Sequence, residues 1–191
     1  MNVISNSRLA DPIRILRAGH EKIRAVCDRL DRLADDLYHG EALKDAALAA
    51  EYLTHDLPLH VAEKEEDFFP LLLARCRPED AADEMVALLR QEHRKPEKLL
   101  EALVGDLGRV AAGRLPERPL EFVWRLMAFT ENQRRHTAWA DATVLRLARL
   151  RLSAADRALL AKRMAGRRAA LTTARSPPRA PAGAPLHRLS A

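Results

Sequence analysis

The sequence predicts an all-α protein, and composition, periodicity and loop length support this prediction. Ala, Leu, Arg and Glu dominate the 191 residues, whereas only 7 residues are glycine and 4% are aromatic. This composition is typical of helices. Apolar residues recur at steps of three and four over long stretches, which is the period of an amphipathic helix. Because short connections force neighbouring helices to run antiparallel, we predict an up-down-up-down antiparallel four-helix bundle with a short fifth helix and a disordered C-terminal tail.

The first two predicted helices cover about residues 11–38 and 41–76. Apart from one histidine, the apolar face of the first is formed by Leu16, Ile23, Cys27, Leu30, Ala34 and Leu37. The His39-Gly40 pair predicts its end. The second helix contains Pro58 and Pro70. Each proline removes one backbone hydrogen bond, so each favours a kink.

The third predicted helix runs from Pro78 to about residue 112, and the break at 113–116 separates it from a fourth helix over about 122–150. The segment Ser153-Ala-Ala-Asp156 is typical of a helix cap. It predicts a short fifth helix that ends near Gly166. Prolines and small residues interrupt any period from Leu171 onward. We therefore predict a bundle domain over 1–168 and a disordered basic tail, rich in Pro, Ala and Arg, over 169–191.

The charge distribution argues against a nucleic-acid-binding body. Five arginines and no acidic residue follow Gly166, which leaves 27 basic and 27 acidic residues before it. The tail accounts for the whole net charge of +5, and five spread charges support only weak, salt-sensitive binding to nucleic acid. No stretch approaches the roughly 18 apolar residues of a membrane span, and the N-terminus does not resemble a signal peptide. We expect a soluble, cytoplasmic protein.

Four histidines fall one per predicted helix, on or beside the apolar face: His20, His60, His93 and His136. Counted from the predicted helix ends in antiparallel pairs, their heights agree to within about 0 to 3 Å at roughly 1.5 Å per residue. Four imidazoles are therefore expected in one layer of the core. Burying them without partners is costly, and a bound metal ion satisfies them directly.

Carboxylates at helical spacing could complete a metal site. Glu63 lies three residues after His60, Glu97 lies four after His93, and Asp141 lies five after His136. Carboxylates bridge cations and offset their charge, so these three are the candidate acidic ligands. For each of them, a solvated surface acid is the alternative interpretation.

The residues around these histidines resemble the hemerythrin-like, HHE cation-binding family. The resemblance covers about residues 11–150 and rests on His20, the segment HVAEKEEDFFP that begins at His60, the QEHR segment with His93, and the HTAWAD segment that begins at His136. It implies a four-helix bundle around a non-haem di-iron centre, with His20, His60, His93 and His136 as ligands. It also implies dioxygen binding, or a role in oxygen, nitric-oxide, redox or iron sensing and storage.

The carboxylates depart from the family pattern. The family usually has glutamate four residues after the helix-2 histidine, where this chain has Lys64, and many relatives have one four residues after the helix-4 histidine, where it has Ala140. Asp141 matches the spacing of the oxygen carriers, which have a second histidine at the position of Glu97. Lys64 is thus predicted to modulate the site, because an ammonium group there repels metal cations unless its flexible stem swings outward.

Three arrangements remain open. Glu63, Glu97 and Asp141 could provide unusual bridges for two iron ions, or one metal ion could bind through three or four histidines. Alternatively, Lys64 could pair with Glu97 or Asp141 and replace the cation. The first two predict a non-haem iron protein that binds dioxygen or nitric oxide. The third predicts a metal-poor helical bundle that acts as an interaction module. We do not expect an enzyme, because no general base or nucleophile beyond the ligands is evident.

Overall fold

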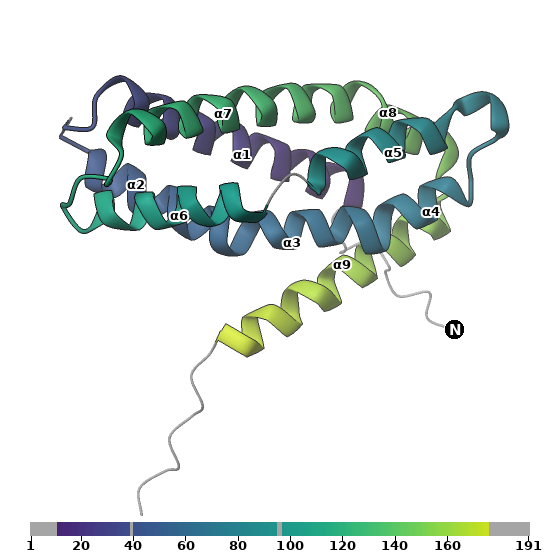
Figure 1. The fold of residues 1–191 in the computed structure, drawn as a ribbon. Helices are drawn as coiled ribbons and strands as arrows, with labels where there is room; N and C mark the ends of the chain where they lie inside the picture. The colour runs from purple at the N-terminus through teal and green to yellow at the C-terminus, as the bar shows by residue number, and fades with distance from the viewer. Residues whose placement is uncertain (1–10, 39, 95–96, 176–191) are drawn as a thin grey trace, which may run out of the picture.

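The structure, a computed structural model, describes residues 11–38, 40–94 and 97–175 of the chain. Within these ranges all the regular elements are helical (Figure 1). The α-helices are α1 (Pro12–Asp35), α2 (Ala42–Glu51), α3 (Leu57–Ala62), α4 (Phe69–Leu73), α5 (Ala82–His93), α6 (Glu97–Ala111), α7 (Pro119–Ala142), α8 (Val144–Arg151) and α9 (Ala154–Arg175). Two π-helical segments, η1 (Tyr52–Asp56) and η2 (Glu63–Phe68), and one 3₁₀ turn, η3 (Pro78–Asp80), complete them.

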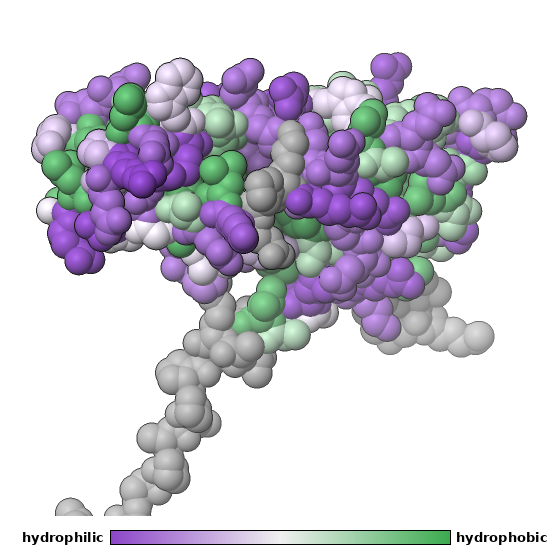
Figure 2. Space-filling view, viewed as in Figure 1, coloured by the Kyte–Doolittle hydropathy of each residue, from purple (hydrophilic) through white to green (hydrophobic). Residues whose placement is uncertain are grey.

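Helix α1, the continuous stretch from α2 to α4, the pair α5 and α6, and the pair α7 and α8 lie side by side along the long axis (Figure 1). Helix α1 packs against both α7 and α2, and α2 packs against α6. The all-helical prediction is confirmed, while the up-down-up-down order stays a prediction. Hydrophilic side chains cover most of the face seen in Figure 2. None of the described helices is long and apolar enough to cross a membrane.

The second predicted helix is continuous in outline, but two of its turns are widened. A proline in an α-helix leaves the carbonyl four residues earlier without a partner and its ring presses against that carbonyl. For Pro58 and Pro70 these carbonyls belong to Thr54 and Glu66, which lie inside η1 and η2. A π turn has the wider spacing that accommodates the ring. The helix therefore absorbs both prolines without breaking.

The third and fourth predicted helices are each divided, which corrects the expectation of continuous helices. Helix α5 ends at His93, where the Arg94 N–H donates to the Arg90 carbonyl. The residue before a proline is disfavoured in the α conformation. The sequence therefore permits this break before Pro96, which itself lies outside the described residues. Thr143 separates α7 from α8, and its hydroxyl donates to the Trp139 carbonyl, a bond that competes with helix continuation.

The fifth helix is longer than predicted. Its cap is confirmed, since the Ser153 hydroxyl accepts from the Asp156 N–H and the Asp156 carboxylate accepts from the Ser153 N–H. The helix continues through Gly166 to Arg175 instead of ending near residue 166, and its far end projects away from the bundle (Figure 1). Ion pairs from Arg167 and Arg168 to η2 fix it beyond the glycine. Part of the predicted disordered tail is thus helical, and residues 176–191 lie outside the description.

The buried apolar residues form two clusters at opposite ends of the bundle. One joins the C-terminal half of α1 to α2, α6 and the first part of α7, with Leu30, Leu53, Leu107 and Phe122 at its centre. The other joins the start of α1 to α4, α5, α8 and α9 and includes Ile13, Phe69, Leu89 and Met164. The buried residues between the two clusters are mostly polar and include His20, His60, Lys64 and His136, and this layer holds the candidate site.

Candidate functional site

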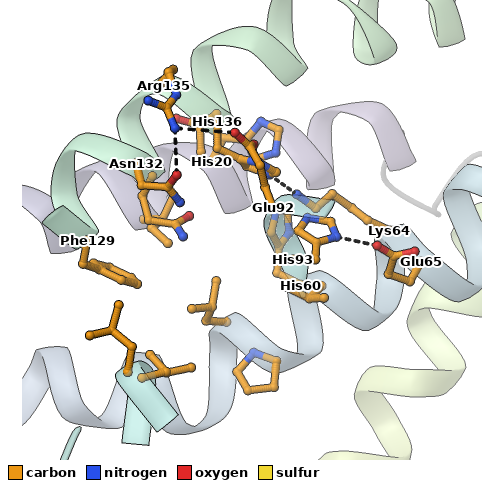
Figure 3. Close-up of a pocket in the computed structure, with 18 of the residues that line it drawn as sticks. His20, His60, Lys64, Glu65, Glu92, His93, Phe129, Asn132, Arg135 and His136 are labelled. Carbon is orange, nitrogen blue, oxygen red and sulfur yellow. Dashed lines mark hydrogen bonds and ion pairs between the residues drawn. The ribbon is translucent and has the colours of Figure 1, made fainter. Parts of the chain in front are cut away.

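The four histidines meet in the layer between the two apolar clusters. His20 comes from α1, His60 from α3, His93 from the end of α5 and His136 from α7. The ring centroids of His20 and His60 are 5.1 Å apart, and those of His93 and His136 are 5.0 Å apart. All four line one cavity (Figure 3). The heights counted from the sequence therefore correspond to a real histidine cluster.

Close packing fixes the His60 ring. A Cβ atom at Gly19 would lie 2.5 Å from His60 Nδ1 and 2.6 Å from Cε1, so only glycine lets α1 approach this imidazole. Gly19 immediately precedes His20, and both rings are thereby held at the contact between α1 and α3. The glycine serves helix packing, since it lies inside an ordinary α-helix.

Lys64 lies within the histidine cluster. Its side chain is buried at the second position of η2, and its Nζ lies 2.8 Å from Nε2 of His136. It therefore does not swing outward. The Lys64–Asp141 pair considered from the sequence is not formed, because Asp141 contacts His20 and Arg24 instead. Burial lowers the pKa of Lys64 to about 7, although the nearby carboxylates of Glu65, Glu92 and Asp141 act in the opposite direction and raise it.

Three histidines share one pattern of outer contacts. Nδ1 of His20 lies 2.7 Å from Asp141, Nδ1 of His93 lies 2.5 Å from Glu65, and Nδ1 of His136 lies 2.6 Å from Glu92. Each of these carboxylates also faces an arginine. The partners are Arg24 for Asp141 at 3.2 Å, Arg90 for Glu65 at 2.9 Å and Arg135 for Glu92 at 3.7 Å. The result is three chains of histidine, carboxylate and arginine around the cluster.

The outer carboxylates determine which ring nitrogen carries the proton. An ionised carboxylate only accepts hydrogen bonds, so Nδ1 of His20 and His93 must donate. Burial raises the pKa of Asp141 and of Glu65, but their histidine and arginine partners more than offset this and hold both pKa values below the ordinary range. In a neutral imidazole the other nitrogen, Nε2, is then an acceptor.

The inner nitrogen atoms lack partners. Nε2 of His20, His60 and His93 is buried without a hydrogen bond. Burial is the main cause that lowers the pKa of all three rings, to about 4 for His93, and the positive charge of Lys64 lowers it further. The rings are therefore neutral imidazoles near neutral pH. A carboxylate on the outer nitrogen and a free lone pair on the inner one is the usual arrangement of a metal-binding histidine.

Two of the three acidic residues predicted as ligands, Glu63 and Asp141, do not join the inner face of the cluster. Glu63 is fully buried on the other side of η2, where Arg168 binds both of its oxygens at 2.6 and 2.9 Å. Asp141 contacts the outer nitrogen of His20. The side chain of Glu97 lies outside the described residues. Among the side chains that are described, no group of three or more His, Cys, Asp or Glu residues is arranged to hold a metal ion.

Sequence reasoning missed the parts played by Glu65 and Glu92. Glu65 belongs to the acidic run after His60, which is easily mistaken for a solvated surface, and Glu92 directly precedes His93. The π turn of η2 changes the helical register after residue 62, so spacing counted at 3.6 residues per turn fails there. A glutamate close in sequence to His60 and to His93 was a signal that could have pointed to these residues. The sequence held no signal for the pairing of Glu92 with His136, because the two lie on different helices.

A cavity of about 720 Å³ opens beside the cluster. Its polar lining includes the four histidines and Lys64, together with Glu65, Glu66, Glu92, Glu131, Asn132, Gln133, Arg135 and Thr137. Ile23, Leu57, Leu100, Leu103 and Phe129 contribute apolar walls, and Figure 3 labels Phe129 among them. The site is thus a set of buried imidazoles and one buried amine, beside a cavity that has both apolar walls and further polar residues.

An all-helical fold with one histidine from each of four helix segments in a common layer defines a histidine-centred helical-bundle protein. The sequence matches the Hemerythrin HHE cation binding domain over residues 11–148, and the chain belongs to this family. It is also 36% identical over 67 residues to an uncharacterized protein of Haemophilus influenzae. This alignment covers 33% of the chain and 39% of that relative.

Proposed function

We propose that this protein binds one iron ion through the four histidines and uses it to bind dioxygen or nitric oxide, as a sensor of oxygen, redox state or iron. The observation that carries this proposal is the set of three buried Nε2 atoms without partners, on His20, His60 and His93. Imidazole nitrogen suits iron. When bound, iron would supply an open coordination position for a diatomic ligand.

The donor set fits one metal ion better than two. The described residues offer imidazole nitrogens on the inner face, while Asp141, Glu65 and Glu92 face the outer nitrogens and Glu63 faces Arg168. Without bridging carboxylates, the positive charge of a second ion is not offset. The four histidines are not yet arranged as a metal-binding group in the described structure, so iron binding requires the imidazoles to reorient and Lys64 to release His136.

The protein's own residues have clear tasks in this proposal. Asp141 and Glu65 hold the rings of His20 and His93 with their inner lone pairs directed into the site, which raises the basicity of a ligand. The apolar walls keep bulk water away from the bound diatomic molecule. These are binding tasks, so we propose a binding protein and not an enzyme.

Metal analysis tests the proposal directly. The full chain is purified without chelator and without a metal-affinity step, and its iron content and visible absorption are measured before and after ferrous iron and nitric oxide are added. About one iron per chain and a spectrum that changes with nitric oxide are expected. The variant His136→Ala should lose iron, whereas His55→Ala, at a half-exposed histidine outside the cavity, should keep it.

The alternative is a metal-free bundle that acts as an interaction module, with Lys64 in place of the cation. The 2.8 Å contact between Lys64 and His136 favours it. This alternative predicts a stable, folded protein that takes up no iron when ferrous iron is supplied. That result would overturn the iron proposal.

A further inference from the structure

The cavity beside the histidine cluster is far larger than a diatomic ligand requires. Its volume of about 720 Å³ lies within the range of roughly 300 to 1,000 Å³ that is typical of pockets for small organic molecules. Residues from α1, α3, α6 and α7 form its apolar walls: Ile23, Leu57, Val61, Leu100, Leu103 and Phe129. A mainly apolar molecule would gain free energy by covering them.

The polar end of the cavity restricts the head group of such a molecule. Nε2 of His20 and His93 can only accept, because Asp141 and Glu65 hold the proton on Nδ1 of each ring. Both Nε2 atoms are buried without a partner. A buried acceptor without a donor costs about 1 to 3 kcal/mol, so the site calls for a group that donates a hydrogen bond.

Lys64 adds the opposite requirement. Its Nζ hydrogens are donors, and His136 accepts one of them. A head group beside Lys64 must therefore also accept. The head group must therefore donate to a histidine nitrogen and accept from Lys64. A hydroxyl does both, because it has one donor and two lone pairs.

Glu66, Glu131 and Arg135 also line the cavity, but the charges next to the inner histidine nitrogens argue against an ionic head group at that position. Asp141, Glu65 and Glu92 each face an arginine, so their charges are largely offset from outside. An ammonium head would be repelled by Lys64. A carboxylate head would place its lone pairs against the lone pairs of His20 and His93. A neutral hydroxyl avoids both conflicts.

From this complementarity we propose that the cavity binds an apolar molecule with a single hydroxyl head group. The hydroxyl accepts a hydrogen bond from Lys64 and donates one to Nε2 of His20 or His93, and the apolar part lies along Leu100, Leu103 and Phe129. This binding requires no metal ion, because Lys64 and the free imidazoles supply the contacts. The test of this proposal is therefore independent of the test of iron binding.

Calorimetric titration of the full, chelator-treated chain with 1-octanol, octanoate and octylammonium tests the head group with the tail held constant. We expect 1-octanol to bind one per chain and at least about tenfold more tightly than either ion. Lys64→Met should weaken 1-octanol binding by about fivefold, the equivalent of one hydrogen bond.

A second variant keeps the test decisive if Lys64→Met fails to fold. Leu100→Trp fills the apolar wall and should abolish 1-octanol binding, whereas Leu48→Trp, on α2 outside the cavity lining, should leave it unchanged. Octanoate or octylammonium binding as tightly as 1-octanol would overturn the proposal. So would 1-octanol binding that survives Leu100→Trp, or the absence of any 1-octanol binding, which would leave water as the only occupant.

Discussion

Nζ of Lys64 and Nε2 of His136 lie 2.8 Å apart inside a layer that otherwise presents free imidazole lone pairs. A lysine thus takes the position beside His136 that a metal ion would need. The four histidines predicted as ligands line one cavity, and we expect the behaviour of the site to depend on this one amine.

Replacing Lys64 with methionine should stabilise the metal-free protein by roughly 1 kcal/mol or more. The change removes a buried ammonium, and this relief exceeds the loss of one hydrogen bond. The folded pKa of Lys64 is about 7 and its ordinary value is 10.5, so the gain is full below pH 7 and fades as pH rises toward 10.5. Calorimetric unfolding across this range measures it, with the exposed Lys98→Met as control. A variant less stable than wild type below pH 7 would contradict the prediction.

Replacing Lys64 with glutamate should increase iron binding. The new carboxylate replaces a repelling charge with a compensating one at the inner face of the cluster. Ferrous iron should bind at least about tenfold more tightly than to wild type, as measured by competition with a chelator of known affinity. Lys98→Glu introduces the same charge on the surface of α6 and should have no such effect. Equal iron affinity of Lys64→Glu and wild type would count against the proposed inner site.

Acid should destabilise the protein through its buried imidazoles. Burial lowers the pKa of His93 to about 4 from an ordinary value of 6.5. As pH falls, this histidine is therefore protonated in the unfolded chain before it is protonated in the folded protein. The free energy of unfolding should therefore fall, on the order of 3 kcal/mol, as pH drops from 6.5 to 4. His93→Gln should flatten this slope in denaturant unfolding at a series of pH values. An unchanged slope would show that other groups control it.

Asp141→Asn should weaken metal binding without unfolding the protein. The carboxylate orients His20 through Nδ1, and loss of such an outer partner typically costs 10- to 100-fold in metal affinity. A melting temperature close to wild type, together with weaker iron binding in the same chelator competition, is the expected pair of results. Asp28→Asn, at an exposed aspartate of α1 that pairs with Arg134, is the control. Equal iron affinity in both variants would exclude a positioning role for Asp141.

Gly19→Ala should destabilise the protein, because the new methyl group would lie 2.5 Å from the His60 ring. Overpacking of this kind costs about 1 to 3 kcal/mol. Gly105→Ala is a matched control in α6, where a Cβ meets nothing within 4 Å, and it should instead stabilise by roughly 0.5 to 1 kcal/mol. Thermal unfolding of both variants compares them, and equal behaviour would refute the close packing at His60.

The sequence was sufficient to predict the helical class and the common level of the histidines, because both depend on the regular rise of a helix. It was insufficient for the carboxylates. Glu63 follows His60 at the spacing of a ligand, yet the structure pairs it with Arg168 of α9, more than a hundred residues away. Such long-range ion pairs leave no local signal, and they also explain why α9 continues past Gly166. The π turns on either side of His60 follow from Pro58 and Pro70. A proline can bend, break or widen a helix, so the sequence does not say which of these occurs.

The polar layer between the two apolar clusters also fixes how the helices align along their axes. Sliding one helix past its neighbours by a single turn, about 5.4 Å, would move an imidazole into an apolar cluster and separate it from its carboxylate. It would also bring a leucine against the remaining imidazoles. Buried polar groups that specify helix alignment in this way are well established in coiled coils. In this protein the same side chains that form the site exclude misaligned packings of the bundle, before any ligand is bound.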